Sequence, residues 1–218
     1  MKNGPVTEDR SRGEIPEGMS EDAAETWPSQ ELIKSWLGNE LDFEMRLGEH
    51  TPIPDDPESA ARARRFRDVL GLFASGVTVV TSMSDGSPVG MTCQSFSSVS
   101  LEPPLVMFCP AKTSRAWPMM QRAGFFCVNF LSADQAEVSQ AMATKGNDKY
   151  DGIAWRPAAT GAPMIDGAIG FVDCTVHSVH EAGDHYVVLG RVRELGFGED
   201  GKPLLYFRGG YDTVARQD

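Results

Sequence analysis

Two long apolar runs joined by a tight turn constrain the fold of this chain more than any other feature. Residues 169–179 and 186–195 are rich in β-branched and aromatic side chains, and Gly183-Asp184 between them is a turn signal. Shorter runs of the same kind cover 77–82, 89–98, 105–109, 125–131 and 204–207, and Asp85-Gly86 predicts a hairpin between the first two. Many strands with short connections predict a mainly β fold, mostly antiparallel, that closes into a barrel.

The helices expected from the sequence are few and short. They cover 58–75, ending at Gly76; 113–122, with Pro118 near the first turn; and 132–142, capped by Ser132. The segment 145–163 is predicted to be mostly loop.

One motif is misleading. Residues 196–201 match the GxGxxG spacing of dinucleotide-binding folds, but they run into Lys202-Pro203 and another strand. Since no helix N-terminus follows to receive a pyrophosphate, we interpret this segment as a hairpin loop.

Charge divides the chain into an acidic extension and a nearly neutral body. Residues 1–60 hold 15 Asp or Glu against 5 Lys or Arg, within a total net charge of -11. No basic surface is expected for nucleic acid or anionic membranes. Neither a secretory signal nor a run long enough to span a membrane is visible, so the expected location is the cytoplasm.

We place the domain boundary at the proline-rich linker 51–57. Residues 1–57 then form the extension, and 58–218 form the folded domain. The composition of 1–26 favours disorder. Apolar residues at helical spacing predict an amphipathic helix within 28–47, which either packs on the domain itself, docks to a partner or covers the ligand site.

The four cysteines, Cys93, Cys109, Cys127 and Cys174, lie far apart in the sequence. Their spacing fits no zinc or iron–sulfur motif, so no metal is expected and the thiols are predicted to be reduced.

The stretch 90–117 carries the clearest chemical signal. A strand crowded with hydroxyl side chains gives way to an apolar strand after Glu102-Pro103-Pro104. Small donors and exposed backbone N–H groups suit a flat ligand with polar edges, although a serine-rich turn on an ordinary barrel has the same composition.

This stretch resembles the flavin-contacting segment of short-chain flavin reductases that serve two-component monooxygenases. A second similar motif follows downstream, EAGDH at 181–185 with GRV at 190–192, and the likeness extends from about Phe66 to Tyr211. The resemblance implies a six-stranded antiparallel Greek-key split barrel that binds flavin and forms a homodimer. Within this family, the likeness is greatest to the reductase component of a seco-steroid phenol hydroxylase from actinobacteria.

The resemblance also implies roles for individual residues. His185 contacts the nicotinamide, with Asp184 orienting the turn. Flavin contacts are implied for four groups of residues: Thr92, Cys93, Gln94 and Ser95 at the ring edge; Ser98, Val99 and Ser100 in the turn beside it; Ala111, Lys112, Thr113 and Ser114 near the ribityl and phosphate end; and Phe130, Gly183, Arg208 and Tyr211 elsewhere.

The implied activity is reduction of FMN or FAD by NADH, with NADPH less favoured, for a separate flavin-dependent oxygenase. Two alternatives stay open at this point. The barrel either retains its flavin and acts on an organic substrate itself, or it has lost turnover and serves as a flavin-binding partner protein.

Overall fold

The structure is a computed structural model that describes residues 56–144 and 148–215. The predictions for the acidic extension, including the helix within 28–47, lie outside the described residues apart from Asp56 and Pro57.

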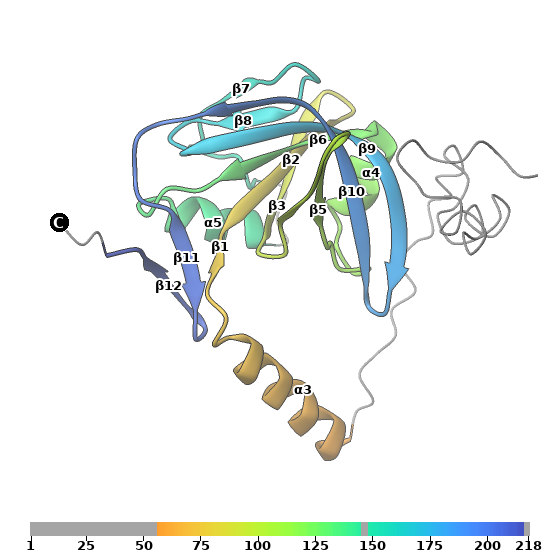
Figure 1. The fold of residues 1–218 in the computed structure, drawn as a ribbon, viewed down its shortest axis with the longest axis vertical. Coiled ribbons are helices and arrows are strands. Elements are labelled where there is room, and N and C mark those ends of the chain that lie inside the picture. The colour runs from red at the N-terminus through yellow and green to blue at the C-terminus, as the bar shows by residue number, and fades with distance from the viewer. Residues whose placement is uncertain (1–55, 145–147, 216–218) are drawn as a thin grey trace, which may run out of the picture. The chain divides into compact units, whose positions relative to one another are not determined.

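A seven-stranded antiparallel sheet forms the centre of the molecule (Figure 1). Its order is β3-β2-β6-β9-β10-β5-β4. The strands are β2 (Thr78–Ser84), β3 (Ser87–Cys93), β4 (Ser97–Leu101), β5 (Pro104–Phe108), β6 (Phe125–Phe130), β9 (Gly170–Ala182) and β10 (His185–Phe197). The mainly β prediction is confirmed.

The sheet has seven strands rather than six because the hydroxyl-rich run 89–98 is divided. β3 ends at Cys93, and β4 begins at Ser97 as an edge strand paired with β5. Ser95 lies between them and binds the backbone of Cys109, with Cys109 N donating to Ser95 Oγ over 2.8 Å. This side-chain bond links the break between β3 and β4 to the residue that follows β5.

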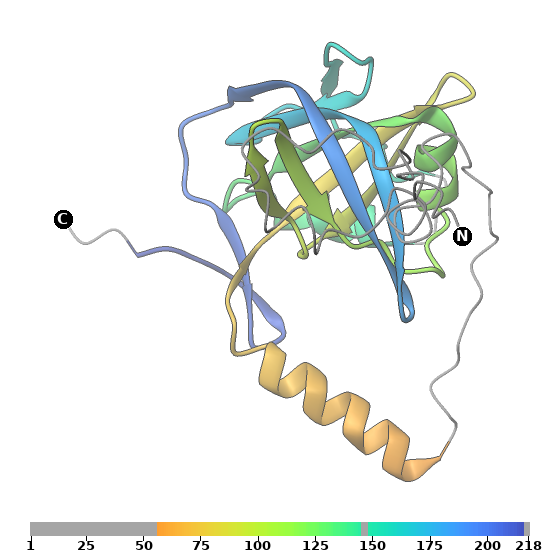
Figure 2. The same ribbon diagram turned by 45° about the vertical axis from the view of Figure 1, so that its right-hand side comes forward.

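The two hairpin turns were predicted correctly. Asp85 and Gly86 both have positive φ, 51° and 77°, as a two-residue hairpin turn requires. β9 and β10 pair along their whole length, and the tip of their hairpin extends beyond the neighbouring strands (Figures 1 and 2).

In the part of the chain that the structure describes, two smaller sheets accompany the central one. β1 (Ser75–Gly76), β11 (Leu204–Phe207) and β12 (Gly210–Thr213) form one, and β7 (Trp155–Pro157) and β8 (Pro163–Ile165) form the other. β1, β7, β8 and β12 were not predicted: each is two to four residues long, and β1 lies at the end of the segment 58–75 that was expected to be helical.

The GxGxxG-like segment consists of the last two residues of β10 followed by a loop, and no helix follows it. It is not a hairpin loop, however, because it joins β10 to β11 in a different sheet. Gly198 N donates to Ile169 O, and a Cβ at Gly198 would lie 1.9 Å from Ala168 O. A glycine is therefore required at position 198 because the backbone of Ala168 lies so close that no side chain fits.

Between residues 56 and 215, apart from the undescribed residues 145–147, three helices accompany the sheets: α3 (Pro57–Leu70), α4 (Trp117–Ala123) and α5 (Ala136–Ala143). α3 ends before Gly71 instead of reaching Gly76. Pro118 lies in the first turn of α4, as expected. Gln135, and not Ser132, occupies the N-cap position of α5, without a side-chain capping bond; the Ser132 hydroxyl donates to Asp134 Oδ1 over 2.6 Å.

The largest core cluster lies between the central sheet and α4. Phe108 packs edge-on against both Trp117 and Phe126, with ring centres 5.7 Å and 4.9 Å apart. All three side chains are at most 2% exposed. This cluster fixes β5, whose C-terminal end leads directly into the segment 109–114.

No helix in the described ranges is long and apolar enough to cross a membrane.

Candidate functional site

The turn between β9 and β10 lies directly against the segment that follows β5. Lys112 N donates to Asp184 O, and Tyr186 N donates to Pro110 O, both over 2.9 Å. Ala111 and His185 form an isolated antiparallel bridge. Two motifs that are distant in the sequence, AKTS and EAGDH, are thus one structural unit.

An ion pair connects the same two segments through their side chains. Lys112 Nζ lies 3.1 Å from Glu181 Oε2 and 5.6 Å from the centre of the Tyr186 ring. The Lys112 side chain is only 8% exposed, whereas that of Glu181 is 49% exposed. The Lys112 side chain is therefore packed against the β9–β10 hairpin, and its ammonium group is paired with the Glu181 carboxylate.

His185 and Asp184 lie at the accessible tip of the hairpin. His185 Nδ1 is 2.8 Å from Asp184 Oδ1, and the two side chains are 44% and 68% exposed. When Nδ1 donates to the carboxylate, Nε2 is left as the second polar atom of the ring. The imidazole therefore has a carboxylate partner and access to solvent.

Ser95 connects the hydroxyl-rich segment to this unit. Its Oγ accepts from Cys109 N, donates to Cys109 O over 3.3 Å, and lies 3.1 Å from Cys93 Sγ. Because Cys109 is two residues before Ala111, Cys93 and Ser95 lie beside the segment that the hairpin tip contacts. The structure brings these predicted residues together.

Other predicted residues gather around α5 instead. The Thr92 hydroxyl donates to Ser139 O over 2.5 Å, and the Tyr211 hydroxyl donates to Ser139 Oγ over 2.9 Å. Arg208 has a positive φ of 50°, and its backbone N donates to Gly71 O. These observed contacts link Thr92, Tyr211 and Arg208 to α5 and to the residue after α3.

The predicted residues at the end of the hydroxyl-rich stretch lie near the surface. Gln94, Ser98 and Val99 are exposed, and the β4–β5 pairing shifts register between Ser98 and Ser100. Ser100 Oγ donates to Glu102 O over 3.2 Å. Such an irregular edge leaves backbone groups outside the ladder.

Ser114, Thr113 and Phe130 also have identifiable surroundings. Ser114 Oγ accepts from Trp117 N over 3.2 Å, so this hydroxyl supports the start of α4. Thr113 is exposed. The Phe130 ring lies 5.2 Å from that of Phe96, which joins β6 to the link between β3 and β4.

Three of the four cysteines have thiols whose protonated form is favoured by burial. All four are free thiols, and burial raises the pKa of Cys109 and Cys127, and that of Cys174 to about 12. Within residues 56–144 and 148–215, no group of His, Cys, Asp and Glu could hold a metal ion.

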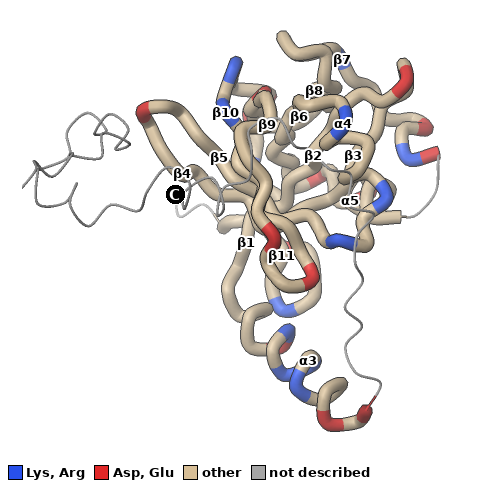
Figure 3. Tube along the Cα trace, turned by 90° about the vertical axis from the view of Figure 1, so that its right-hand side faces the viewer, with Lys and Arg blue, Asp and Glu red and all other residues tan. Residues whose placement is uncertain are grey.

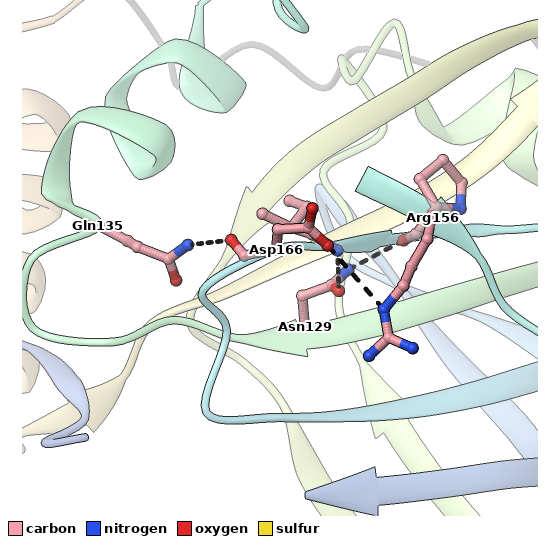
Figure 4. A network of polar contacts seen from close by, with 6 residues as sticks. Asn129, Gln135, Arg156 and Asp166 are labelled. Atoms are coloured by element: carbon pink, nitrogen blue, oxygen red, sulfur yellow. Dashed lines mark hydrogen bonds and ion pairs between the residues drawn. The ribbon is translucent and has the colours of Figure 1, made fainter. Parts of the chain in front are cut away.

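Sequence reasoning missed a buried polar network beside Phe130. Asn129 Oδ1 accepts from Ile165 N over 2.8 Å, and its Nδ2 donates to Val79 O over 3.2 Å. Gln135 Nε2 donates to Asp166 O over 2.8 Å, so two side chains hold the segment around β8 (Figure 4). The only sequence signal is an asparagine inside an apolar strand.

Comparison with known proteins defines the class to which this fold and site belong. Residues 70–215 match the model of the flavin reductase like domain, and the chain belongs to that family.

Particular relatives are more specific. The chain is 48% identical to the reductase subunit HsaB of a flavin-dependent monooxygenase from Rhodococcus jostii, over 74% of this chain and 85% of that protein. It is 39% identical to the FMN reductase (NADH) SmoA of Agrobacterium fabrum, over 78% of this chain and 94% of that protein.

A solved structure agrees with these relatives. This chain superposes on nitrilotriacetate monooxygenase component B from Mycobacterium thermoresistibile with a TM-score of 0.70, and the two are 47% identical. The match covers 72% of this chain and 88% of that one. The predicted family is thereby confirmed.

Proposed function

We propose that this protein oxidises NADH, or less readily NADPH, and reduces FMN or FAD that it then releases to a separate flavin-dependent oxygenase. The support is membership of the flavin reductase-like family together with relatives that are reductase subunits of monooxygenases. The observation that carries the proposal is the contact between the AKTS segment and the EAGDH hairpin, because it brings the two ends of the expected site together.

The reaction moves a hydride from the nicotinamide C4 to the flavin N5, and the two cosubstrates supply that chemistry themselves. The protein has to hold the reacting atoms about 3 to 3.5 Å apart and to stabilise the charge that develops on the flavin ring. Small donors along an open edge suit this task better than a buried general acid or base.

In this proposal the flavin ring lies along the segment between β3 and β4. Cys93, Gln94 and Ser95 line its edge, and Ser98, Val99 and Ser100 lie beside it. Ala111, Lys112, Thr113 and Ser114 lie toward the ribityl chain and phosphate, and Phe130 flanks the ring. Support comes from the contacts of Ser95 with Cys109, which join the first group to the third.

The nicotinamide end is assigned to the hairpin tip. His185 contacts the pyridine nucleotide from its exposed position, Asp184 orients the imidazole, and Gly183, with a φ of 63°, allows the turn. Thr92, Arg208 and Tyr211 are also assigned to the flavin site. Thr92 and Tyr211 already bond to Ser139, so we expect them to shape the site through α5.

Three broader features belong to the proposal. The fold is a Greek-key split barrel, in which the long β9–β10 hairpin lies in the middle of the strand order, with β6 on one side and β5 on the other. The protein works as a homodimer, supported by large apolar side chains exposed on and after α3. Its four free thiols suit the reducing cytoplasm.

The test uses purified full-length protein, NADH and free flavin, with absorbance followed at the nicotinamide band. We expect rapid NADH oxidation that requires added FMN or FAD in amounts above the protein concentration, because flavin is turned over and released. Activity only with tightly bound flavin and a second organic substrate would contradict the proposal. So would the absence of NADH oxidation under all these conditions.

A further inference from the structure

The lysine assigned to the phosphate end of the flavin already has a charged partner. Lys112 Nζ contacts Glu181 Oε2 at 3.1 Å, and the lysine side chain is almost buried. Much of its positive charge is therefore balanced by a carboxylate on the hairpin. A phosphate that approaches Lys112 meets an ion pair instead of an isolated cation.

The backbone keeps this carboxylate close to the lysine. Lys112 N donates to Asp184 O, three residues after Glu181 in the same hairpin. The Tyr186 ring lies against the lysine ammonium at 5.6 Å. Because the Glu181 carboxylate lies 3.1 Å from Lys112 Nζ, a phosphate bound to this ammonium lies close to that carboxylate as well.

The electrostatic consequence depends on the form of the flavin. A phosphate monoester carries a charge of roughly -1.5 to -2 near neutral pH, whereas riboflavin has no phosphate. Repulsion from Glu181 and its competition for Lys112 both act on the phosphate alone. The isoalloxazine ring is unaffected by either.

We propose that Glu181 is a specificity-determining residue, which weakens the hold of Lys112 on the flavin phosphate and so favours release of the flavin. The inference rests on the proposed function, in which reduced flavin has to leave the protein. A site that balances its own cation retains a phosphorylated ligand less tightly than one that leaves the cation unpaired.

The test compares the affinity of FMN with that of riboflavin, measured by quenching of flavin fluorescence without NADH. Glu181→Gln keeps a side chain that can accept from Lys112 but removes the charge. We expect FMN to bind about threefold to fivefold more tightly to this variant, the upper range for an exposed ion pair. Riboflavin affinity should stay within about twofold, and the gain for FMN should shrink at high salt.

Two further variants sharpen the test. Lys112→Met should weaken FMN binding and leave riboflavin binding unchanged. Glu199→Gln removes an exposed carboxylate beyond the opposite end of β10 and should change neither affinity. Thermal unfolding verifies that each variant folds, and Glu181→Ala replaces Glu181→Gln if the latter does not.

The results separate this inference from the proposed function. If Glu181→Gln leaves FMN affinity unchanged or lowers it, or if FMN and riboflavin tighten equally, Glu181 is not a specificity determinant and the inference is wrong. If the wild-type protein turns over NADH with free flavin in that case, the proposed function stands. If it neither binds flavin nor oxidises NADH, both are wrong.

Discussion

At the scale of single residues, hydroxyl groups that the sequence suggests as ligand contacts also bond to the backbone. Ser95 binds both backbone groups of Cys109, and Ser114 supports the first turn of α4. Small polar side chains commonly bond to nearby backbone in this way. Composition alone therefore cannot separate a ligand-lining serine from one that shapes the loop.

His185 is the residue whose proposed role can be tested most directly. His185→Ala removes the imidazole that Asp184 orients at 2.8 Å, while leaving the backbone bonds of the hairpin in place. We expect KM for NADH to rise about tenfold, the effect of losing roughly 1.4 kcal/mol of binding. FMN affinity from fluorescence titration should stay within about twofold.

The matched control for His185 is His177→Ala, an exposed histidine in the same hairpin. It should change neither quantity. A collapse of flavin binding in His185→Ala with an unchanged NADH dependence would show that the two ends of the site are assigned in reverse.

Asp173 should make stability depend on pH. This carboxylate is fully buried and accepts from Thr160 N over 2.8 Å and from Thr160 Oγ1 over 2.6 Å. Burial raises the pKa of Asp173 above the ordinary value of about 3.9. The native state then binds more protons than the unfolded state, so this contribution to stability is full at low pH and is lost as pH rises through the native pKa.

Asp173→Asn should remove that loss, since an amide can bond to Thr160 without ionising. The free energy of unfolding, measured by urea titration from about pH 4 to pH 7, is expected to decline less with rising pH than in the wild type. Asp151→Asn, at an exposed position, is the control. An identical pH dependence in wild type and Asp173→Asn would show that Asp173 titrates equally in both states.

At the scale of elements, the sequence predicts the long strands and the turns well, because their signals are local. The aromatic-rich run of β6, the valine-rich run of β10 and the Asp85-Gly86 turn depend on neighbouring residues only. β4 was missed as a separate strand because its boundary depends on Ser95 reaching Cys109, which is remote in sequence. The contact between the hairpin tip and the segment 110–112 is likewise tertiary and invisible to local patterns.

Gly190 shows how packing constrains an element beyond its propensity. A Cβ at this position of β10 would lie 2.3 Å from Phe126 Cζ and 3.1 Å from Cys174 Cβ, both in the core. Gly190→Ala is therefore expected to lower the free energy of unfolding by about 3 kcal/mol, the upper range for overpacking. Chemical denaturation measures the change.

Gly76→Ala in β1 is the control for Gly190, because no atom lies within 4 Å of its added Cβ. It should change stability by less than about 0.5 kcal/mol. Equal effects of the two substitutions would contradict the packing argument.

At the scale of the whole molecule, α3 combines basic and apolar surfaces in a way that a monomer does not explain. Four arginines lie on this helix, Arg62, Arg64, Arg65 and Arg67 (Figure 3). Phe66, Val69, Leu70, Leu72 and Phe73 on and after the helix are each 53% to 81% exposed. An exposed apolar group of this size typically marks an interface.

We expect a second copy of the chain to cover this surface, in accord with the proposed homodimer. The full-length protein should elute at the mass of a dimer in size-exclusion chromatography with light scattering. Phe73→Glu, which places a charge at the most exposed of these side chains, should shift the equilibrium toward monomer by at least tenfold in dissociation constant. Ser87→Glu, beside the exposed β2–β3 turn, should leave the dimer intact.

Two results would contradict this prediction. If the wild-type protein is monomeric at all concentrations, a different partner covers the apolar surface. If Phe73→Glu does not affect the dimer, the interface lies elsewhere on the molecule.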